Sequence, residues 1–495
     1  MTSTLSQRIR ANLDSGRAEA FETDGRWVSW PQVAAVAARV EALLQEMGIG
    51  ANTAIGLAGR NHVWNAAAML GLLAGERCVA PINPFQPQER MVADTAKLAL
   101  AAVIVEPEDL TSGEFEALAR GAGIGLISLG GMGPDDAGIV VARDQGKPAP
   151  DSGQTAVLMP TSGPTGTPKR IPIRFDSLNA ANRDSEVAIR DFGELDAPAH
   201  ETSPMIQYSP IVHISGTLNV ARCGSEGRRL ILVEKFEAAP WVDIVERHAI
   251  RVAGLPPTMM KMLLILDPPP ERLASLKGVW SGSAPVDMSV VKEFEARYGA
   301  RVMGNYGATE FCGPIASGCY EDRDLFGDTK EGTVGRLRRG VVNARVVDPE
   351  TGEVLPAGAV GVLELQVHRM GPEWMRSSDL ASLDADNFLF IHGRADDAII
   401  RGGFKIVPSV IGDALKRHPR VNDVSVIGIP HERLGQTPVA AVEVRPGPPL
   451  SGEELMDFLR SELVAYQVPT EIKVLDALPR TPSMKVDKAA VKALF

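Results

Sequence analysis

The hydrophobic positions in the N-terminal part of the chain follow two alternating spacings. Apolar residues at helical spacing, such as Val33, Val36 and Val40, give way to short apolar runs that are typical of buried strands. Helices and buried strands that alternate in this way predict right-handed βαβ units and a largely parallel sheet. The predicted helices are residues 30–47, 62–73 and 87–98, and the predicted strands are residues 53–57, 78–82 and 101–105.

Strands dominate the pattern in the C-terminal part. Valines and leucines alternate over residues 341–347 and 360–367, as they do in half-buried strands. Further strands are predicted at residues 424–429, 439–444 and 472–475, with a helix that begins at the capping box of Ser451 and Glu454. We therefore expect an α/β fold, in which a large N-terminal domain of βαβ subdomains and a β-rich subdomain precedes a small α+β C-terminal domain. Residues 131–150, rich in glycine, aspartate and proline, are interpreted as a linker.

Composition narrows the classes of function. The 495 residues are 44% hydrophobic and 23% charged, which is ordinary for a globular protein with a large core. The formal net charge of −11 argues against a nucleic-acid partner but leaves small anionic ligands open. The sequence has no apolar run long enough for a membrane span and no signal-peptide pattern. The four cysteines lack metal-site spacing and are expected to be reduced, so we predict a cytoplasmic location.

A loop rich in hydroxyls and glycines follows the apolar run at residues 155–159 and ends at Lys169. Glycines let backbone N–H groups approach an anion, hydroxyls add donors, and the lysine adds a positive charge. The spacing differs from that of a P-loop, in which the lysine directly follows the second glycine. A polyphosphate cradle and a plain polar surface loop both fit this composition. The candidate phosphate ligands are Thr161, Ser162, Gly163, Thr165, Gly166, Thr167 and Lys169.

This loop resembles the phosphate loop of the adenylate-forming (AMP-binding) superfamily, which includes the acyl- and aryl-CoA synthetases. The family pattern runs Thr/Ser-Ser/Thr-Gly-Thr-Thr-Gly-x-Pro-Lys, and Pro164 is the one departure from it. The resemblance implies that the loop holds the β- and γ-phosphates of ATP. Proline lacks a hydroxyl and an N–H group, so Pro164 predicts a cradle with fewer donors.

Two more segments resemble the family's acid and adenine sites. His213 resembles the histidine that lines the acid pocket, although a structural histidine is the plainer alternative. Residues 306–310 resemble the Tyr-Gly-x-Thr-Glu segment, in which the tyrosine stacks near adenine, the threonine reaches the phosphate and the glutamate helps to hold Mg²⁺. The implied catalytic residues here are His213, Thr309 and Glu310, with Glu310 as the metal ligand, and the implied nucleotide contacts are Ser283, Ala284, Pro285, Asn305, Tyr306 and Gly307.

The C-terminal motifs complete the resemblance. Asp379 falls at the ribose-binding aspartate of the family, and Arg394 at its nucleotide-binding arginine. Asp396 falls at the hinge to the mobile lid domain, which implies domains 1–395 and 396–495. Gly402 and Gly403 are implied to line the thiol tunnel. Lys485 matches the catalytic lysine, preceded by Met484 where the family usually has glycine.

The resemblance implies an acid–thiol ligase that uses ATP, Mg²⁺ and coenzyme A. A carboxylate would attack the α-phosphorus of ATP to give an acyl-adenylate and pyrophosphate, and coenzyme A would then take the acyl group. The acceptor could instead be a carrier protein, and a non-catalytic ATP-binding homologue is a further alternative suggested by Pro164 and Met484. A homodimer is one option for its assembly.

The predicted acid pocket is apolar and bulky, which favours an aromatic or a short- to medium-chain carboxylic acid. Trp280 could equally close this pocket or pack in the core. The candidate pocket residues are Val212, Ile214, Trp280, Met303 and Phe311.

Overall fold

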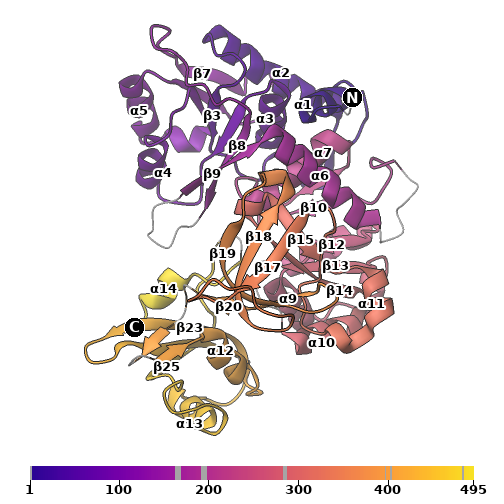
Figure 1. The fold of residues 1–495 in the computed structure, drawn as a ribbon. Helices are drawn as coiled ribbons and strands as arrows, with labels where there is room; N and C mark the ends of the chain where they lie inside the picture. Colours follow the sequence, from indigo (N-terminus) through magenta and orange to yellow (C-terminus); the bar gives the residue numbers. More distant parts are fainter. Residues whose placement is uncertain are drawn as a thin grey trace. The chain divides into compact units, whose positions relative to one another are not determined.

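The computed structural model describes residues 3–161, 169–190, 198–282, 287–395, 397, 399–401, 404–481 and 484–495. These residues fall into two units (Figure 1). The first comprises Met1–Thr329 with Val367–Gly371, and the second comprises Lys330–Gln366 with Pro372–Phe495.

A seven-stranded sheet with the order β7-β6-β5-β3-β4-β8-β9 forms the N-terminal part of the first unit. Its inner strands pair in parallel, whereas the edge strands β7 and β9 are antiparallel to their neighbours. The strands are β3 Ala54–Leu57, β4 Cys78–Pro81, β5 Ala102–Val105, β6 Gly125–Leu129, β7 Ala137–Val141, β8 Thr155–Thr161 and β9 Lys169–Arg174. The predicted parallel sheet is confirmed, but the interpretation of residues 131–150 as a linker is wrong. The apolar run inside that stretch forms β7 and pairs with β6.

Helices cover both faces of this sheet because alternate side chains of its strands point to opposite faces. On β3, Ile55 joins the core cluster that includes α2 and α3, whereas Ala54 joins the cluster that includes α4 and α5. The helices are α1 Leu5–Leu13, α2 Trp30–Glu46, α3 Val63–Ala74, α4 Gln88–Thr95 and α5 Glu114–Ala122. Ser29 and Gln32 form a capping box at the start of α2, which fixes where this helix begins.

Two smaller sheets complete the first unit. One has the order β10-β11-β1-β2, and the other contains the parallel strands β12, β13 and β14 with β15 antiparallel to β14. The strands are β1 Phe21–Thr23, β2 Arg26–Val28, β10 Met205–Gln207, β11 Leu230–Leu232, β12 Val252–Gly254, β13 Gly278–Gly282, β14 Arg301–Ala308 and β15 Gly313–Ser317. The helices are α6 Phe175–Arg190, α7 Ile214–Glu226, α8 Ala238–His248, α9 Pro257–Leu266, α10 Met288–Tyr298 and α11 Tyr320–Phe326.

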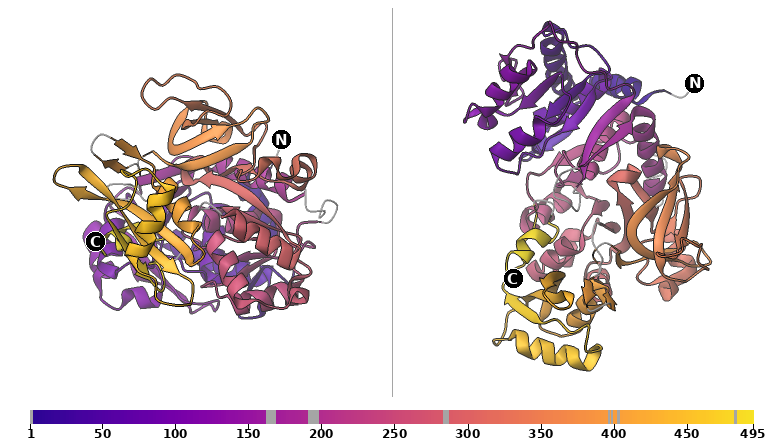
Figure 2. Two further views of the ribbon diagram at one scale, coloured as in Figure 1. Left: turned by 90° about the horizontal axis from the view of Figure 1, so that it is seen from below. Right: turned by 60° about the vertical axis from the view of Figure 1, so that its left-hand side comes forward.

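The second unit contains two sheets, as the alternating pattern of the sequence predicts. The first has the order β17-β18-β19-β20, and the second has the order β22-β21-β24-β23 with β25 parallel to β24. Helix α13 packs on the second sheet through Leu455 and Leu459 (Figure 2). The elements are β16 Arg336–Leu337, β17 Val342–Val347, β18 Gly361–Val367, β19 Met375–Leu383, β20 Leu389–Arg394, β21 Ile399–Arg401, β22 Phe404–Ile406, α12 Pro408–Lys416, β23 Val421–His431, β24 Gly435–Val444, α13 Gly452–Glu462, β25 Glu471–Leu475 and α14 Lys488–Lys492.

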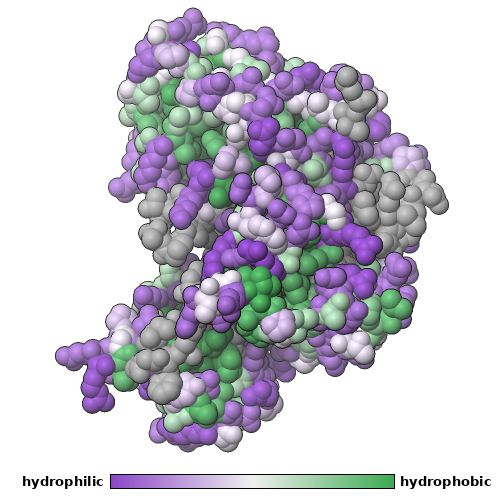
Figure 3. Space-filling model, in the orientation of Figure 1, coloured by the Kyte–Doolittle hydropathy of each residue, from purple (hydrophilic) through white to green (hydrophobic). Residues whose placement is uncertain are grey.

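The cysteines are reduced in the structure, as the sequence predicts. All four cysteines are free thiols, and Cys78, Cys223 and Cys312 are buried. Burial raises the pKa of the Cys312 thiol to about 12. Figure 3 shows hydrophobic residues interspersed among hydrophilic ones on one face of the molecule. Among the described residues, no helix is both long and apolar enough to cross a bilayer.

Helices α2 and α3 pack closely because α3 has glycine at the contact. A Cβ atom on Gly71 would lie 2.9 Å from the Cβ of Ala37 and 3.0 Å from its Cα. We expect Gly71→Ala to lower the free energy of unfolding by about 1–3 kcal/mol, since the Ala37 backbone cannot yield without moving a helix. Urea titration measures this change. In the matched control Gly121→Ala, a Cβ atom meets nothing within 4 Å, so a gain of up to about 1 kcal/mol from helix propensity is expected. Equal effects of the two substitutions would contradict the packing argument.

Candidate active site

The predicted phosphate loop connects the two strands of an antiparallel hairpin. Thr161 at the end of β8 lies opposite Lys169 at the start of β9, and the Thr161 Oγ1 atom donates to the Lys169 carbonyl oxygen at 3.4 Å. The apolar strand predicted before the loop is confirmed as β8. The candidate ligands Ser162, Gly163, Thr165, Gly166 and Thr167 lie outside the described residues, as does Pro164. The structure thus brings the two ends of the candidate cradle together.

Arg170 fastens this hairpin to the rest of the sheet. Its Nη1 atom donates to the carbonyl oxygen of Pro81 at 2.6 Å and to that of Leu158 at 3.1 Å. Desolvation lowers the pKa of the Arg170 guanidinium, as expected for a cation held against backbone carbonyls away from water. The position of Lys169, its neighbour on β9, is therefore fixed through the arginine.

The predicted adenine and pocket residues gather on strands β13 and β14. Trp280 lies opposite Met303 in these parallel strands, and Gly282 lies opposite Asn305. A Cβ atom on Gly282 would come within 2.6 Å of the Asn305 carbonyl oxygen, so glycine is needed for this approach. Met303 is buried, and Trp280 is half-buried. Ser283, Ala284 and Pro285, which follow β13, lie outside the described residues.

The segment after Asn305 turns sharply at the end of β14. Ser317 on β15 donates to Asn305 Oδ1 at 3.0 Å. The rings of Tyr306 and Phe311 lie 6.1 Å apart between centroids, and Phe311 is buried. Gly307 lies at a register shift of the β14–β15 pair. Thr309, Glu310 and Phe311 form a short 3-10 helix from which the Glu310 side chain is exposed. A carboxylate that reaches solvent beside a candidate nucleotide site is suited to bind a hard cation.

The predicted acid-pocket histidine ends a tight turn. His213 is half-buried at the N-cap position of α7, and Val212 before it is buried. Ile214 begins the helix and is half-buried. The His213 N–H group donates to the Pro210 carbonyl oxygen at 2.9 Å. The turn therefore leaves His213 half-buried, while Val212 and Ile214 pack with the main core cluster of the first unit.

In the second unit, the predicted ribose and nucleotide residues are cross-strand neighbours. Asp379 on β19 lies opposite Arg394 on β20. The Asp379 N–H group donates to Ser377 Oγ at 3.1 Å, and Arg394 Nη2 donates to Ser378 Oγ at 2.6 Å. The antiparallel pairing thus places the Asp379 carboxylate and the Arg394 guanidinium side by side on neighbouring strands.

Lys485 lies in a hairpin-like loop of the second unit. The Thr481 N–H group donates to the Lys485 carbonyl oxygen, and the Met484 N–H group donates to the Thr481 carbonyl oxygen, both at 2.8 Å. Arg480 anchors the loop by donating to Asp423 at 2.8 Å. Desolvation by nearby protein atoms lowers the pKa of the Lys485 ammonium, although the side chain is exposed and solvent limits this effect. The predicted hinge Asp396 and the tunnel residues Gly402 and Gly403 lie outside the described residues.

Two family descriptions match the sequence. "AMP-binding enzyme" covers residues 10–371, and "AMP-binding enzyme C-terminal domain" covers residues 411–485. The chain belongs to the AMP-binding enzyme family. The predicted resemblance is confirmed, and so is the fold of a large N-terminal α/β part with a small C-terminal part.

The relatives of this AMP-binding enzyme include several CoA ligases. 4-Coumarate–CoA ligase 5 of Oryza sativa subsp. japonica is 26% identical over 495 aligned residues, which cover 95% of this chain and 90% of the relative. Sulfoacetate–CoA ligase of Cupriavidus necator is 31% identical over 360 residues, which cover 69% of this chain and 67% of the relative. ATP-bound MatB from Rhodopseudomonas palustris has the same fold, with a TM-score of 0.84 at 24% identity over 100% of this chain and 99% of MatB. The chain is therefore a distant member of the AMP-forming acid–thiol ligases.

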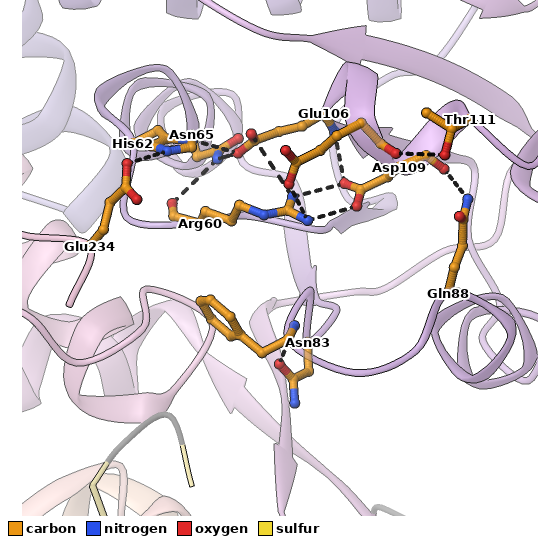
Figure 4. Close-up of polar contacts among 11 residues, drawn as sticks. Arg60, His62, Asn65, Asn83, Gln88, Glu106, Asp109, Thr111 and Glu234 are labelled. Carbon is orange, nitrogen blue, oxygen red and sulfur yellow. Dashed lines mark hydrogen bonds and ion pairs between the residues drawn. The ribbon is translucent and has the colours of Figure 1, made fainter.

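The AMP-binding enzyme also contains a charged network that its sequence did not predict. His62 lies between two carboxylates, with Nδ1 2.9 Å from Glu106 and Nε2 2.9 Å from Glu234 (Figure 4). Arg60 binds both carboxylate oxygens of Asp109, at 3.0 and 2.8 Å. Arg60 and His62 follow strand β3, and Glu106 follows the neighbouring parallel strand β5. Polar residues after two adjacent parallel strands are the signal that could have revealed this network.

Burial and charge act in opposite directions on the His62–Glu106 pair. Desolvation lowers the pKa of the His62 imidazole, but the hydrogen bonds and charges of Glu106 and Glu234 outweigh it, so that the pKa is raised. Desolvation raises the pKa of the Glu106 carboxyl, but the hydrogen bonds from His62 and Asn65 and the charges of His62 and Arg60 outweigh it. The net effect is a lowered pKa for Glu106. The network therefore favours a protonated His62 facing an ionised Glu106.

The raised pKa of His62 makes part of the stability depend on pH. The contribution of His62 should be complete below its ordinary pKa of 6.5 and should be lost as the pH rises through the raised folded-state value. The contribution of Glu106 should be lost as the pH falls below its ordinary pKa of 4.5 and through the lowered one. The difference in urea stability between the wild type and His62→Gln should therefore be larger at about pH 6, below the ordinary pKa of His62, than at about pH 9, well above it.

A matched substitution tests whether any histidine would behave in this way. His200 and its partner Glu201 are exposed and lie 3.6 Å apart, so His200→Gln should change stability little at either pH. A pH-independent effect of His62→Gln would contradict the charged pair.

Met484 adopts a backbone conformation that favours glycine. Its φ angle is +63°, in the left-handed region, where the family's usual glycine has no Cβ atom to clash. We expect Met484→Gly to raise the free energy of unfolding by about 1 kcal/mol, and Met484→Asn to have a smaller effect in the same direction. The β-branched substitution Met484→Ile should lower it. Urea titration of the series measures this order, and a loss of stability in Met484→Gly would show that side-chain contacts outweigh the backbone strain.

Proposed function

We propose that this AMP-binding enzyme is an ATP-dependent carboxylic acid:CoA ligase. The carboxylate of an aromatic or short- to medium-chain acid attacks the α-phosphorus of ATP. The new P–O bond forms as the bond to pyrophosphate breaks. The thiol sulfur of coenzyme A then attacks the acyl carbonyl carbon, and AMP leaves. The observation that carries this proposal is the pairing of Thr161 with Lys169 at the mouth of the β8–β9 hairpin, within a chain that belongs to this family.

Charge neutralisation is the main task of the site in the first step. A carboxylate and a triphosphate are both anionic, so the barrier falls when fixed positive charges face the reacting oxygens. We assign Lys169 to the β- and γ-phosphates and Lys485 to the substrate carboxylate and the α-phosphate. The Lys485 side chain is exposed, so its ammonium group is accessible to these anions. Asp379 would accept from the ribose hydroxyls, and Arg394 beside it would contact the nucleotide.

The donor set fits Mg²⁺ bound mainly through the nucleotide. Among the described residues, no cluster of three or more histidine, cysteine, aspartate or glutamate side chains could hold a metal alone. Mg²⁺ typically binds one or two carboxylates together with substrate phosphates, and the exposed Glu310 offers one carboxylate. When bound, the ion supplies positive charge to the phosphate oxygens. Glu310 would hold it beside Thr309, whose hydroxyl we assign to the phosphate.

The predicted acid pocket supports an uncharged substrate tail. No candidate pocket residue carries a formal charge, and three of them, Val212, Met303 and Phe311, are buried. A second acidic group, like that of the sulfoacetate that one relative ligates, would need a cationic partner in such a wall. The name of the coumarate ligase relative points instead to an aromatic acid, which an apolar wall with Trp280 would accommodate. A hinge at Asp396 and a cytoplasmic location are part of the same proposal.

Pyrophosphate release tests this function directly. The protein would be incubated with ATP, Mg²⁺ and a panel of benzoates, cinnamates and fatty acids, each with and without coenzyme A. We expect release of pyrophosphate and AMP with one class of acid, and formation of the thioester only with coenzyme A. Lys485→Ala should reduce adenylate formation by about 10²–10³-fold while ATP still binds. The exposed Lys492, on helix α14, provides the matched control Lys492→Ala, which should be as active as the wild type.

Other outcomes would redirect the proposal. Pyrophosphate release that stops after one turnover with coenzyme A present would favour a carrier-protein acceptor. ATP binding without pyrophosphate release for any acid would favour a non-catalytic homologue.

A further inference from the structure

Asn61 holds the turn that presents the predicted acid-pocket residues. Its Nδ2 atom donates to the carbonyl oxygens of Val233 at 2.9 Å and Ser209 at 3.3 Å, and its Oδ1 atom accepts from the Ile211 N–H group at 2.9 Å. Asn61 is only 2% exposed, so water cannot easily replace these bonds. One amide side chain thus provides both the donors and the acceptor that two loops need.

Two other buried side chains complete the support of the turn. Thr217 Oγ1 donates to the Ile211 carbonyl oxygen at 2.7 Å from helix α7. Gln207 donates to the Ser209 carbonyl oxygen from the end of β10. The backbone groups of the turn therefore depend on side chains, since buried N–H and C=O groups need partners. Gly216 allows helix α7 to lie close to the turn, because a Cβ atom there would lie 2.2 Å from the Pro210 carbonyl oxygen.

The position of Asn61 is itself fixed on both sides along the chain. Arg60 before it is bound to Asp109, and His62 after it is bound to Glu106 and Glu234 (Figure 4). Glu234 directly follows Val233, whose carbonyl oxygen Asn61 binds. The neighbours of Asn61 thus bind residues that follow strand β5 and strand β11. These contacts fix the backbone position of Asn61 and hence the position of its amide group.

We propose that Asn61 is a positioning residue for the acid pocket. By holding residues 209–213, it sets where Val212 and His213 lie without touching the acid itself. The role in acid recognition rests on the proposed function, whereas the support of the turn does not. Among the described residues, Asn61 forms no hydrogen bond with Thr161 or Lys169, the two ends of the predicted phosphate loop.

Steady-state kinetics of matched variants test this role. We expect Asn61→Ala to raise the KM for the acid about tenfold, while the KM for ATP stays within about twofold, because Asn61 bonds to the turn and not to Thr161 or Lys169. Thr217→Val, which is nearly isosteric, should shift the acid KM in the same direction. The double variant should show less than the product of the two effects, since both act on one turn. Both variants should also change the ratio of kcat/KM between bulky and small acids.

Asn182→Ala is the matched control. Asn182 is also a buried asparagine, and it donates to Ser225 at 3.2 Å rather than to the turn. It should lower the melting temperature without changing the acid KM. Equal changes of the acid and ATP KM values in Asn61→Ala, or an acid KM in Asn182→Ala that rises as much, would overturn the proposal. If Asn61→Ala does not fold, an unchanged acid KM in Thr217→Val would overturn it.

Hydrogen–deuterium exchange separates this inference from the proposed function. Amides of residues 209–217 should exchange faster in Asn61→Ala or Thr217→Val than in the wild type, but not in Asn182→Ala. Faster exchange in a protein that activates no acid would leave the support of the turn standing and remove only the ligase function. Unchanged exchange would overturn the positioning role even in an active ligase.

Discussion

Buried backbone groups that need hydrogen-bond partners are the constraint on which the proposed site depends. Loops that follow buried strands cannot satisfy all of their carbonyl and N–H groups within a sheet. In this protein, side chains close to the candidate residues supply the missing partners: Arg170 beside Lys169, and Asn61 at the turn of His213. Each anchor is a multidentate side chain, so one residue fixes a loop in more than one direction.

This arrangement divides labour between neighbouring residues. A side chain that must face a substrate cannot also satisfy the protein's own backbone without losing freedom to bind. Lys169 is exposed on β9, whereas Arg170, the next residue, is half-buried and faces carbonyl oxygens. The same division separates Glu310, which is exposed, from Phe311, which is buried. Alternation along extended backbone produces the Lys169–Arg170 pair on β9, whereas Glu310 and Phe311 point apart on a short 3-10 helix.

The sequence predicted the elements with strong periodicity and the residues within motifs. The parallel sheet, the capping box at Ser451 and the strand before the phosphate loop all depend on local spacing, and the structure has them. Strand β7 was missed because its apolar run is short and lies among glycines and aspartates, so that pairing with β6 decides its conformation. Asn61 and Arg170 were missed for a different reason. Their partners are backbone atoms of distant segments. Every residue has the same backbone groups, so the sequence does not indicate which residue will be the partner.

The burial of Cys312 has a consequence for the fate of a reactive intermediate. An acyl-adenylate is an electrophile, and any thiolate near it would compete with the intended acceptor for the acyl group. Cys312 directly follows Phe311 of the predicted acid pocket, yet its sulfur is fully buried and its raised pKa of about 12 keeps it protonated near neutral pH. A thiol so placed is not a nucleophile. In the proposed ligase, this burial would protect the enzyme from acylating itself, so that the choice between thiols is made by access and ionisation rather than by distance.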